Sequence, residues 1–267
     1  MSSPPDPDRS RQDLTWRILV DGPLSGAANM ARDHAIAAAL PPGTGTVRFY
    51  GWSPATLSLG RNEPVTVEYR GFLRRRPEIG VVRRPTGGRA VIHDRELTYS
   101  VAMPARAFGG PRGAYRKVNE GLVEGLRGLG VDARAAGGRV LPPDAGPCFL
   151  EPVGGEVVVG GRKLVGSAQA RIGDAILQHG SVLLVADQSP LLDGPGRKNG
   201  GASPGPVTLA QLLPEVPSRD RLVAAFSRGF ALALGGSWRR GTLTGSEENR
   251  AAELENRYAS ADWTWRR

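Results

Sequence analysis

Alternation of hydrophobic and polar positions predicts that much of the chain forms β-strands. Such stretches cover residues 16–22, 46–52, 55–60, 79–85, 89–104, 156–159, 162–171 and 175–185. The last three are separated by Gly160-Gly161 and Gly173-Asp174, pairs that are typical of tight hairpin turns. We therefore expect these three strands to form an antiparallel meander.

Helical spacing of apolar residues marks four further stretches, which cover residues 25–40, 114–130, 218–234 and 245–260. Ser25 and Ser218 begin two of them, where a side-chain oxygen can cap a helix, and Gly130 can end another. Helices and strands are mixed without a regular βαβ alternation. The pattern predicts an α+β fold in which a mixed, mostly antiparallel sheet is flanked by helices.

Composition indicates one loop-rich domain with poorly ordered parts. Glycine (37) and proline (22) are frequent among the 267 residues. Residues 1–15 have little to bury and predict a disordered N-terminal tail, and residues 193–206 predict a mobile loop. The domain is expected to span 16–238, followed by a C-terminal helical tail at 239–267.

Charge and cysteine content restrict the partners and the location. The formal net charge is +9 and the pI about 10.5, so the surface could attract acidic partners, or the arginines could simply be spread over a solvated surface. The chain shows no zinc-finger or aromatic RNA-binding pattern, which argues against nucleic acid. It has one cysteine, no signal-peptide pattern and no apolar run near the roughly 20 residues that span a bilayer. We expect a cytoplasmic protein without a membrane partner.

Lysine is scarce in this arginine-rich chain, and Lys163 lies in the strand 162–171. Strict alternation puts five residues on one face of that strand: Lys163, Val165, Ser167, Gln169 and Arg171. The opposite face, from Arg162 to Ala170, is small and largely apolar. A compact ammonium group with a tunable pKa is something that arginine cannot supply, so Lys163 is a candidate for chemistry. The alternative is a surface lysine without a role.

The segment "RRPTGGRAVIHD" (83–94) places Gly87-Gly88 between two strands, with arginines on both sides. Such a turn lets backbone amides approach a ligand, and the arginines favour a negative or carbonyl-bearing group. The alternative is an ordinary hairpin. His93 and His179 could each act as a base or hydrogen-bond donor, or be structural.

Cys148 lies in "DAGPCFLEP", which its Gly-Pro and Glu-Pro flanks predict to be a loop. A lone cysteine is usually a small buried hydrophobe. Near a cation such as Lys163, however, its thiolate would be stabilised and nucleophilic at neutral pH. The sequence separation allows this contact without requiring it.

Five segments together resemble the lipoate–protein ligase A and octanoyltransferase branch of the biotin/lipoate ligase-like superfamily, over about residues 16–238. They are "GPLSGAANMARDHA", "RFYGWSPATLSLGR", "RRPTGGRAVIHDRELTYSV", "YRKVNEGL" and "GRKLVGSAQARIGDAILQHGSVLL". The resemblance implies a catalytic domain whose sheet surrounds an acyl-binding tunnel, with the Gly-Gly turn facing the lysine strand.

The family contains two chemistries. Ligases activate free lipoate with ATP and Mg, whereas octanoyltransferases take octanoate from acyl carrier protein, in one group through a cysteine thioester. The sequence reads "GGR" rather than the "GGG" common in ligases, has a cysteine in the "CF" position, and ends soon after the catalytic domain. These features favour a cysteine-dependent octanoyltransferase of protein lipoylation without a cofactor or metal. An ATP-dependent lipoate–protein ligase is the alternative, and a non-enzymatic binding protein is a third.

The resemblance implies the following site. Cys148 and Lys163 would be catalytic. Substrate would be bound by Arg83, Arg84, Thr86, Gly87, Gly88, Arg89, His93, Gly166, Ser167, Ala168, Gln169 and His179. The implied partners are octanoyl-acyl carrier protein and a lipoyl-domain acceptor, such as glycine cleavage H protein or a dehydrogenase E2 subunit. We expect a monomer.

Overall fold

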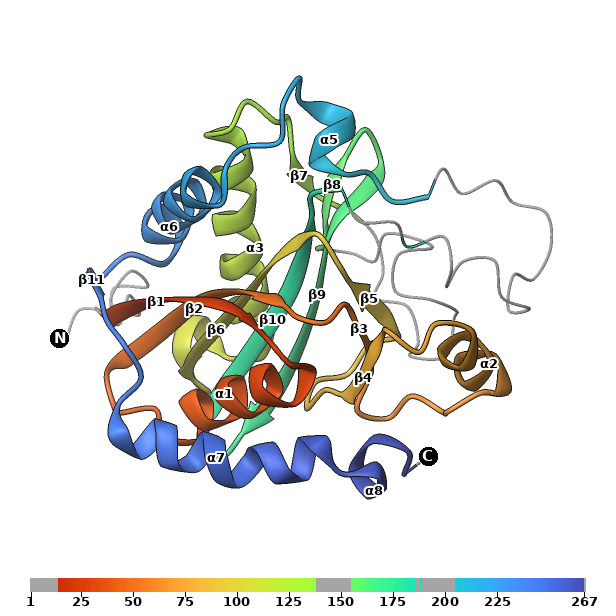
Figure 1. Ribbon diagram of the computed structural model, residues 1–267. Coiled ribbons are helices and arrows are strands. Elements are labelled where there is room, and N and C mark those ends of the chain that lie inside the picture. The colour runs from red at the N-terminus through yellow and green to blue at the C-terminus, as the bar shows by residue number, and fades with distance from the viewer. Residues whose placement is uncertain (1–13, 138–154, 186–187, 189–204, 267) are drawn as a thin grey trace, which may run out of the picture.

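The computed structural model describes residues 14–137, 155–185, 188 and 205–266, and its centre is a mixed eight-stranded sheet (Figure 1). Its strands are β1 (Thr15–Leu24), β2 (Thr44–Trp52), β6 (Glu96–Pro104), β7 (Arg134–Ala135), β8 (Val157–Val159), β9 (Arg162–Ile172), β10 (Ala175–Leu183) and β11 (Ser237–Arg240). Their order is β11-β1-β2-β6-β10-β9-β8-β7. β1 is parallel to β2 and β11, and the other neighbours are antiparallel. The predicted fold class is confirmed, as is the β8-β9-β10 meander.

A three-stranded sheet carries the turn between Arg83 and Arg89. It consists of β3 (Thr56–Leu59), β4 (Gly80–Arg83) and β5 (Val91–His93), in the order β4-β3-β5. The prediction of one strand over 89–104 is wrong, because the chain bends at Asp94-Arg95 and sends β5 and β6 into different sheets. Alternation continues on both sides of this bend, so the pattern alone does not reveal it.

Helices cover both faces of the large sheet (Figure 1). The helices of the described residues are α1 (Gly26–Ala38), α2 (Val67–Arg75), η2 (Ala107–Gly109, a 3₁₀ turn), α3 (Pro111–Arg127), α5 (Leu209–Leu212), α6 (Arg219–Leu234), α7 (Gly245–Ala259) and α8 (Ala261–Thr264). Of these, α2 and α8 pack against the three-stranded sheet instead. On one face, Phe49 and Tyr99 pack with Phe230 of α6. On the other face, Arg48 points to Asp33 of α1. In the described residues, no helix is both long and apolar enough to cross a membrane.

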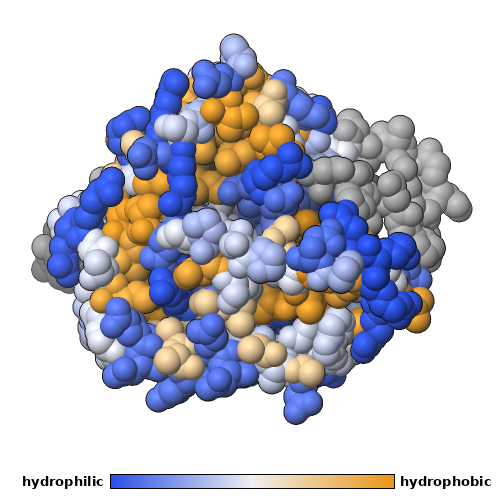
Figure 2. Space-filling model, viewed as in Figure 1, coloured by the Kyte–Doolittle hydropathy of each residue, from blue (hydrophilic) through white to orange (hydrophobic). Residues whose placement is uncertain are grey.

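Sequence periodicity missed α2, which is capped by the side chain of Thr66. Its apolar contact with the protein comes mainly from Phe72, while Arg70, Arg74 and Arg75 are exposed. Figure 2 shows the resulting hydrophilic surface over this helix. α2 is only nine residues long and mostly polar, so its few apolar positions do not stand out as a helix in the sequence.

The C-terminal segment packs against the rest of the domain. β11 extends the large sheet beside β1, and α7 packs along α1. Arg17 of β1 binds Glu247 of α7 at 2.5 Å, and His34 of α1 contacts the Tyr258 hydroxyl at 2.8 Å. The predicted loop 193–206 and tail 1–15 lie almost wholly outside the described residues, although β1 begins at Thr15.

Three glycines let α3 and α6 approach closely. A Cβ atom on Gly229 would lie 2.2 Å from the Gly121 carbonyl oxygen and 2.4 Å from the Gly125 nitrogen. Both contacts are with backbone, which cannot move aside as a flexible side chain can. The glycines therefore set the separation of the two helices.

Replacing Gly229 by alanine is expected to lower the free energy of unfolding by about 3 kcal/mol, because the helices must separate to admit the methyl group. Denaturant unfolding measures this change. Gly71→Ala in α2 is the matched control, since its Cβ would meet only arginine side-chain ends at 3.4 Å and beyond. That variant should gain about 0.5–1 kcal/mol from helix propensity. A Gly229→Ala protein as stable as wild type would show that this close packing contributes nothing.

Candidate active site

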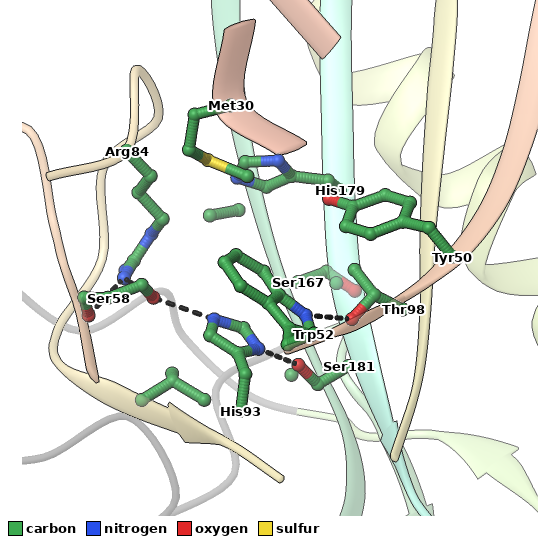
Figure 3. Close-up of a pocket in the computed structure, with 14 residues that line it drawn as sticks. Met30, Tyr50, Trp52, Ser58, Arg84, His93, Thr98, Ser167, His179 and Ser181 are labelled. Carbon is green, nitrogen blue, oxygen red and sulfur yellow. Dashed lines mark hydrogen bonds between the residues drawn. The ribbon is translucent and has the colours of Figure 1, made fainter. Parts of the chain in front are cut away.

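A pocket lies where α1, the large sheet and the three-stranded sheet meet (Figure 3). Large side chains from α1 and β2 line it, namely Met30, Tyr50 and Trp52. The small residues Gly166 and Ala168 of β9 leave the space open. A largely apolar, concave site suits a small ligand with an apolar chain.

An aromatic pair forms one wall of the pocket. The Trp52 and His93 rings stack with centroids 4.0 Å apart and an interplanar angle of 12°. The Trp52 indole donates to the Thr98 hydroxyl at 2.7 Å, and His93 Nε2 contacts the Ser58 hydroxyl at 2.7 Å (Figure 3). His93 Nδ1 contacts Glu96 at 2.7 Å. Both ring nitrogens are thus engaged, and His93 serves as a fixed wall.

Arg83 is the last residue of β4 and Arg84 follows it in the turn, and the two side chains have different surroundings. Arg84 lines the pocket and donates to the carbonyls of Ser58, Gly87 and Arg89 at 2.7–3.1 Å, so it shapes the Gly-Gly turn. Gly88 has φ +79, and a Cβ there would lie 2.9 Å from the Arg84 guanidinium. The positive φ therefore favours glycine, and a Cβ would also displace the end of the Arg84 side chain.

Arg83 points away from the pocket, to the C-terminal segment. It is fully buried and donates to the carbonyls of Gly60, Glu63 and Thr264 at 2.6, 2.8 and 3.0 Å. Its own carbonyl accepts a hydrogen bond from the Trp263 indole at 2.8 Å. The C-terminal segment therefore supports β4, the strand that precedes the Gly-Gly turn.

A buried hydrogen-bond chain connects α1, β10 and the turn. His179 Nδ1 lies 3.0 Å from the Asp33 carboxylate, and Nε2 lies 2.6 Å from the Thr86 hydroxyl. A carboxylate only accepts, so Nδ1 carries the proton and Nε2 accepts from Thr86. The Asp33 carboxylate also accepts from Arg48 at 2.8 Å and from Tyr50 at 2.7 Å.

Burial and these partners set the protonation states. Burial alone would raise the pKa of Asp33, but the His179 hydrogen bond and the Arg48 charge outweigh it, and the pKa lies below its ordinary value. Burial lowers the pKa of His179, so the ring is neutral near neutral pH. Burial and the Asp33 charge raise the pKa of Tyr50 well above its ordinary value. Neutral His179 therefore holds Thr86 without adding charge to the pocket.

Lys163 lies on the pocket face of the sheet because β9 contains a β-bulge. Val157 pairs with Val165, but the next residue, Val158, pairs with Lys163, so Leu164 is the extra residue. Directly paired residues share a face and consecutive ones alternate, which puts Lys163 opposite Val165. The strict alternation that grouped Lys163 with Val165 is therefore wrong. Lys163 is 2% exposed, and its Nζ lies 2.5 Å from Glu156.

The other residues implied by the resemblance are distributed around this site. Gly166, Ser167, Ala168 and His179 line the pocket. The Ser167 hydroxyl points to the opposite side of the sheet, where it contacts the Tyr99 hydroxyl at 2.7 Å. Gln169 lies on that same side and donates to Gln178 at 3.3 Å, away from the pocket. Cys148 lies outside the described residues.

Sequence reasoning missed the α1 and β2 side of the pocket and the partner of Lys163. Asp33, Tyr50 and Glu156 were not singled out. One available signal was Arg48, a charged residue inside the apolar strand "VRFY", which indicates that one strand face meets polar groups. Glu156 had no such signal, because its contact depends on the bulge in β9.

Comparison with known proteins gives consistent matches over nearly the whole chain. The model of the lipoyl protein ligase A/B catalytic domain matches residues 25–231. Octanoyltransferase LipM of Kyrpidia tusciae is 41% identical over 95% of this chain and 99% of its own length. Octanoyltransferase LipM of Bacillus subtilis is 37% identical over 96% and 100%.

Solved structures agree with these matches. Protein Ta0514 of T. acidophilum with bound lipoic acid has a TM-score of 0.77 at 26% identity, covering 94% of this chain and all of that one. Lipoate-protein ligase A bound with ATP also has a TM-score of 0.77, at 27% identity, covering 94% of this chain and 99% of that one.

Proposed function

The chain belongs to the lipoyl protein ligase A/B catalytic domain family, and we propose that it is an octanoyltransferase of protein lipoylation that works through a cysteine thioester. Such an enzyme needs an acyl donor and a lipoyl-domain acceptor protein. We take the donor to be octanoyl-acyl carrier protein. The acceptor would be a lipoyl domain such as glycine cleavage H protein or a dehydrogenase E2 subunit, and the reaction would take place in the cytoplasm.

The position of Lys163 is the observation that carries the proposal. The β9 bulge turns this ammonium to the sheet face on which the largely apolar pocket lies. The carbonyl of an apolar chain bound in such a pocket would lie on the same side of the sheet as this cation. An ammonium there can stabilise a thiolate and the oxyanion of a tetrahedral intermediate.

The described ends of the segment that contains Cys148 lie beside Lys163. The Ala136 nitrogen donates to the Glu156 carbonyl at 2.6 Å, and the Gly155 nitrogen donates to the Ala136 carbonyl at 2.8 Å. Cys148 precedes Gly155 by seven residues, which can span at most about 25 Å. This reach is compatible with a sulfur close to Lys163.

In the first step, the Cys148 thiolate attacks the thioester carbonyl of the donor. The new bond joins Sγ to the octanoyl carbonyl carbon, and the bond to the carrier sulfur breaks, releasing the carrier thiolate. Lys163 would donate a hydrogen bond to the oxyanion that forms between these events. One thioester replaces another, so the step needs no external energy source.

In the second step, a neutral lysine amine of the acceptor attacks octanoyl-Cys148. The new C–N bond gives an amide, the C–S bond breaks, and the proton lost from nitrogen leaves with the thiolate or with solvent. Amide formation from a thioester is downhill, so neither ATP nor Mg takes part. The ATP-dependent ligase alternative is not favoured, because the relatives at 36–41% identity are named octanoyltransferase.

The proposal is tested by supplying the purified chain with octanoyl-acyl carrier protein and a lipoyl domain in the absence of ATP. Mass spectrometry of the acceptor is expected to detect one octanoyl group on its lysine. Free octanoate or lipoate with ATP and Mg should give no modified acceptor. Modification that appears only with ATP and the free acid would refute the transferase assignment.

A further inference from the structure

The outward side of α2 is basic. Phe72 is buried, and Tyr69 and Leu73 are half-buried, so these three residues face the protein. A helix has about 3.6 residues per turn, which places five of the other positions on the opposite side. That side, which we call the α2 face, consists of Val67, Arg70, Gly71, Arg74 and Arg75. Its arginines lie within roughly two turns of one another.

No carboxylate among the described residues pairs with the arginines of the α2 face. Exposed arginines of α3 and α7, in contrast, pair with glutamates of their own helix. Arg74 and Arg75 form no ion pair with any residue that the structure describes. The acidic residue of α2, Glu68, lies in the first turn, whereas Arg74 and Arg75 lie in the last. Arg70 lies over the Trp265 ring, with its guanidinium carbon 4.6 Å from the ring centroid.

Two features of the α2 face lower the stability of the helix. Arg70 and Arg74 are four residues apart, where like charges repel each other. Gly71 lies between them in the helix interior, where glycine is less favourable than alanine. The helix dipole favours arginine in the last turn, but it accounts for neither the repulsion nor the glycine. Residues that weaken an element locally are expected at functional surfaces, so we interpret the α2 face as a binding surface.

α2 is connected to the turn that shapes the pocket. The Tyr69 hydroxyl donates to the Glu63 carboxylate at 2.7 Å. The same carboxylate accepts from the backbone nitrogens of Gly60 and Ala90, both at 2.9 Å. Ala90 ends the Gly-Gly turn, which Arg84 holds from the pocket side. A partner bound to the α2 face would therefore lie next to the turn, with the helix between it and the three-stranded sheet.

This separation from the pocket favours one of the two protein partners. The width of a helix, about 10 Å, and the Gly-Gly turn lie between the α2 face and the pocket. An acceptor lysine has a stem of only four carbons, so a lipoyl domain has to bring its own surface to the pocket. An acyl carrier protein holds its thioester at the end of a long flexible arm, so its body can lie one helix away. Acyl carrier proteins are also acidic, which complements the arginines.

We propose that the α2 face is the docking surface for the acidic acyl carrier protein that delivers the octanoyl group. The inference rests on the proposed octanoyl transfer. The arginines attract the acidic surface of the carrier, and Val67, which is 75% exposed, offers it an apolar contact. The arm of the docked carrier reaches past the Gly-Gly turn to the pocket.

Replacing both Arg74 and Arg75 by glutamate is expected to raise KM for octanoyl-acyl carrier protein on the order of 30-fold, because attraction becomes repulsion. The kcat at saturating carrier and the KM for the lipoyl domain should stay unchanged. With octanoyl-N-acetylcysteamine, an uncharged small thioester, the variant should match wild type. Steady-state transfer to a lipoyl domain measures these constants, and salt at about 0.5 M should reduce the difference in KM for the carrier.

The double variant Arg221→Glu/Arg228→Glu is the matched control. Both arginines are exposed on α6, which packs on the face of the large sheet opposite to α1. The same change in net charge is thus made away from α2, and KM for the carrier should equal that of wild type.

A milder variant covers the case in which glutamate near the end of α2 unfolds the helix. Arg74→Gln/Arg75→Gln removes the two charges without opposing the helix dipole. It should raise KM for the carrier by about 5-fold, because attraction is lost and no repulsion replaces it. Thermal unfolding of each variant checks that the fold is kept.

A titration gives a second readout that does not depend on activity. Fluorescence anisotropy of a labelled acyl carrier protein without its acyl group measures its Kd for the full chain. The Kd should rise in the two α2 variants by the same factors as KM, and stay at the wild-type value in the α6 variant.

These results can contradict the inference separately from the proposed function. The docking surface would be overturned by an unchanged KM for the carrier in both α2 variants, by an equal loss with the small thioester, or by an equal loss in the α6 variant. A rise in KM confined to the lipoyl domain would assign the α2 face to the acceptor instead. A wild-type protein that binds the carrier through α2 but transfers nothing without ATP would refute octanoyl transfer and leave the docking surface supported.

Discussion

Replacing Cys148 by alanine is expected to lower octanoyl transfer by roughly 10⁴-fold or more, because the acyl group then has no covalent carrier between donor and acceptor. Binding of the octanoyl chain should persist, because Met30, Tyr50 and Trp52, which line the described part of the pocket, are unchanged. The rate is measured as octanoylated lipoyl domain formed per enzyme, with the octanoyl-carrier donor at saturation.

Cys148→Ser provides the control for this variant. The hydroxyl has nearly the same size as the thiol but is a much weaker nucleophile near neutral pH, so this variant should also fail to turn over. Retention of more than about a tenth of wild-type activity by the alanine variant would mean that the acyl group moves directly to the acceptor.

Replacing Lys163 by arginine is expected to lower kcat by about 10²–10³-fold, the usual cost of losing one oriented donor to a developing oxyanion. Arginine keeps the positive charge opposite Glu156, so the fold should survive. Its planar guanidinium is too large to put a donor where Nζ lies, since the site is almost fully buried. Single-turnover formation of the acyl-enzyme measures the effect on the first step.

The arginine variant is more informative than Lys163→Ala. Alanine would leave Glu156 buried without this partner, which typically costs 3–5 kcal/mol, about enough to confuse lost stability with lost chemistry. Lys117→Arg on the exposed face of α3 is the control and should behave as wild type. If Lys163→Arg also keeps wild-type kcat, the ammonium has no specific role.

Sequence patterns predicted the fold correctly where a single turn or helix contains all the residues that define it. Gly160-Gly161 fixes a hairpin, so the β8-β9-β10 meander was predictable from sequence. Ser25 and Ser218 cap α1 and α6 as expected. The pattern failed at Asp94-Arg95, where alternation hides a bend, and at α2, which buries mainly Phe72.

The site was harder to predict because it depends on which side of a strand each residue faces. Arg83 and Arg84 are adjacent and identical in type, yet one braces the C-terminal segment and the other shapes the pocket. The side of Lys163 is reversed by one extra residue in β9, and no single-sequence pattern signals that bulge. The type of reaction was instead inferred from several motifs that occur together in the sequence.

Trapping the acyl-enzyme tests the central claim most directly. Wild-type protein is mixed with octanoyl-acyl carrier protein alone, without ATP or acceptor, and its peptides are mapped by mass spectrometry. We expect one octanoyl group on Cys148 that hydroxylamine removes and that passes to a lipoyl domain when one is added. An unmodified Cys148 in protein that still octanoylates the acceptor would contradict the account.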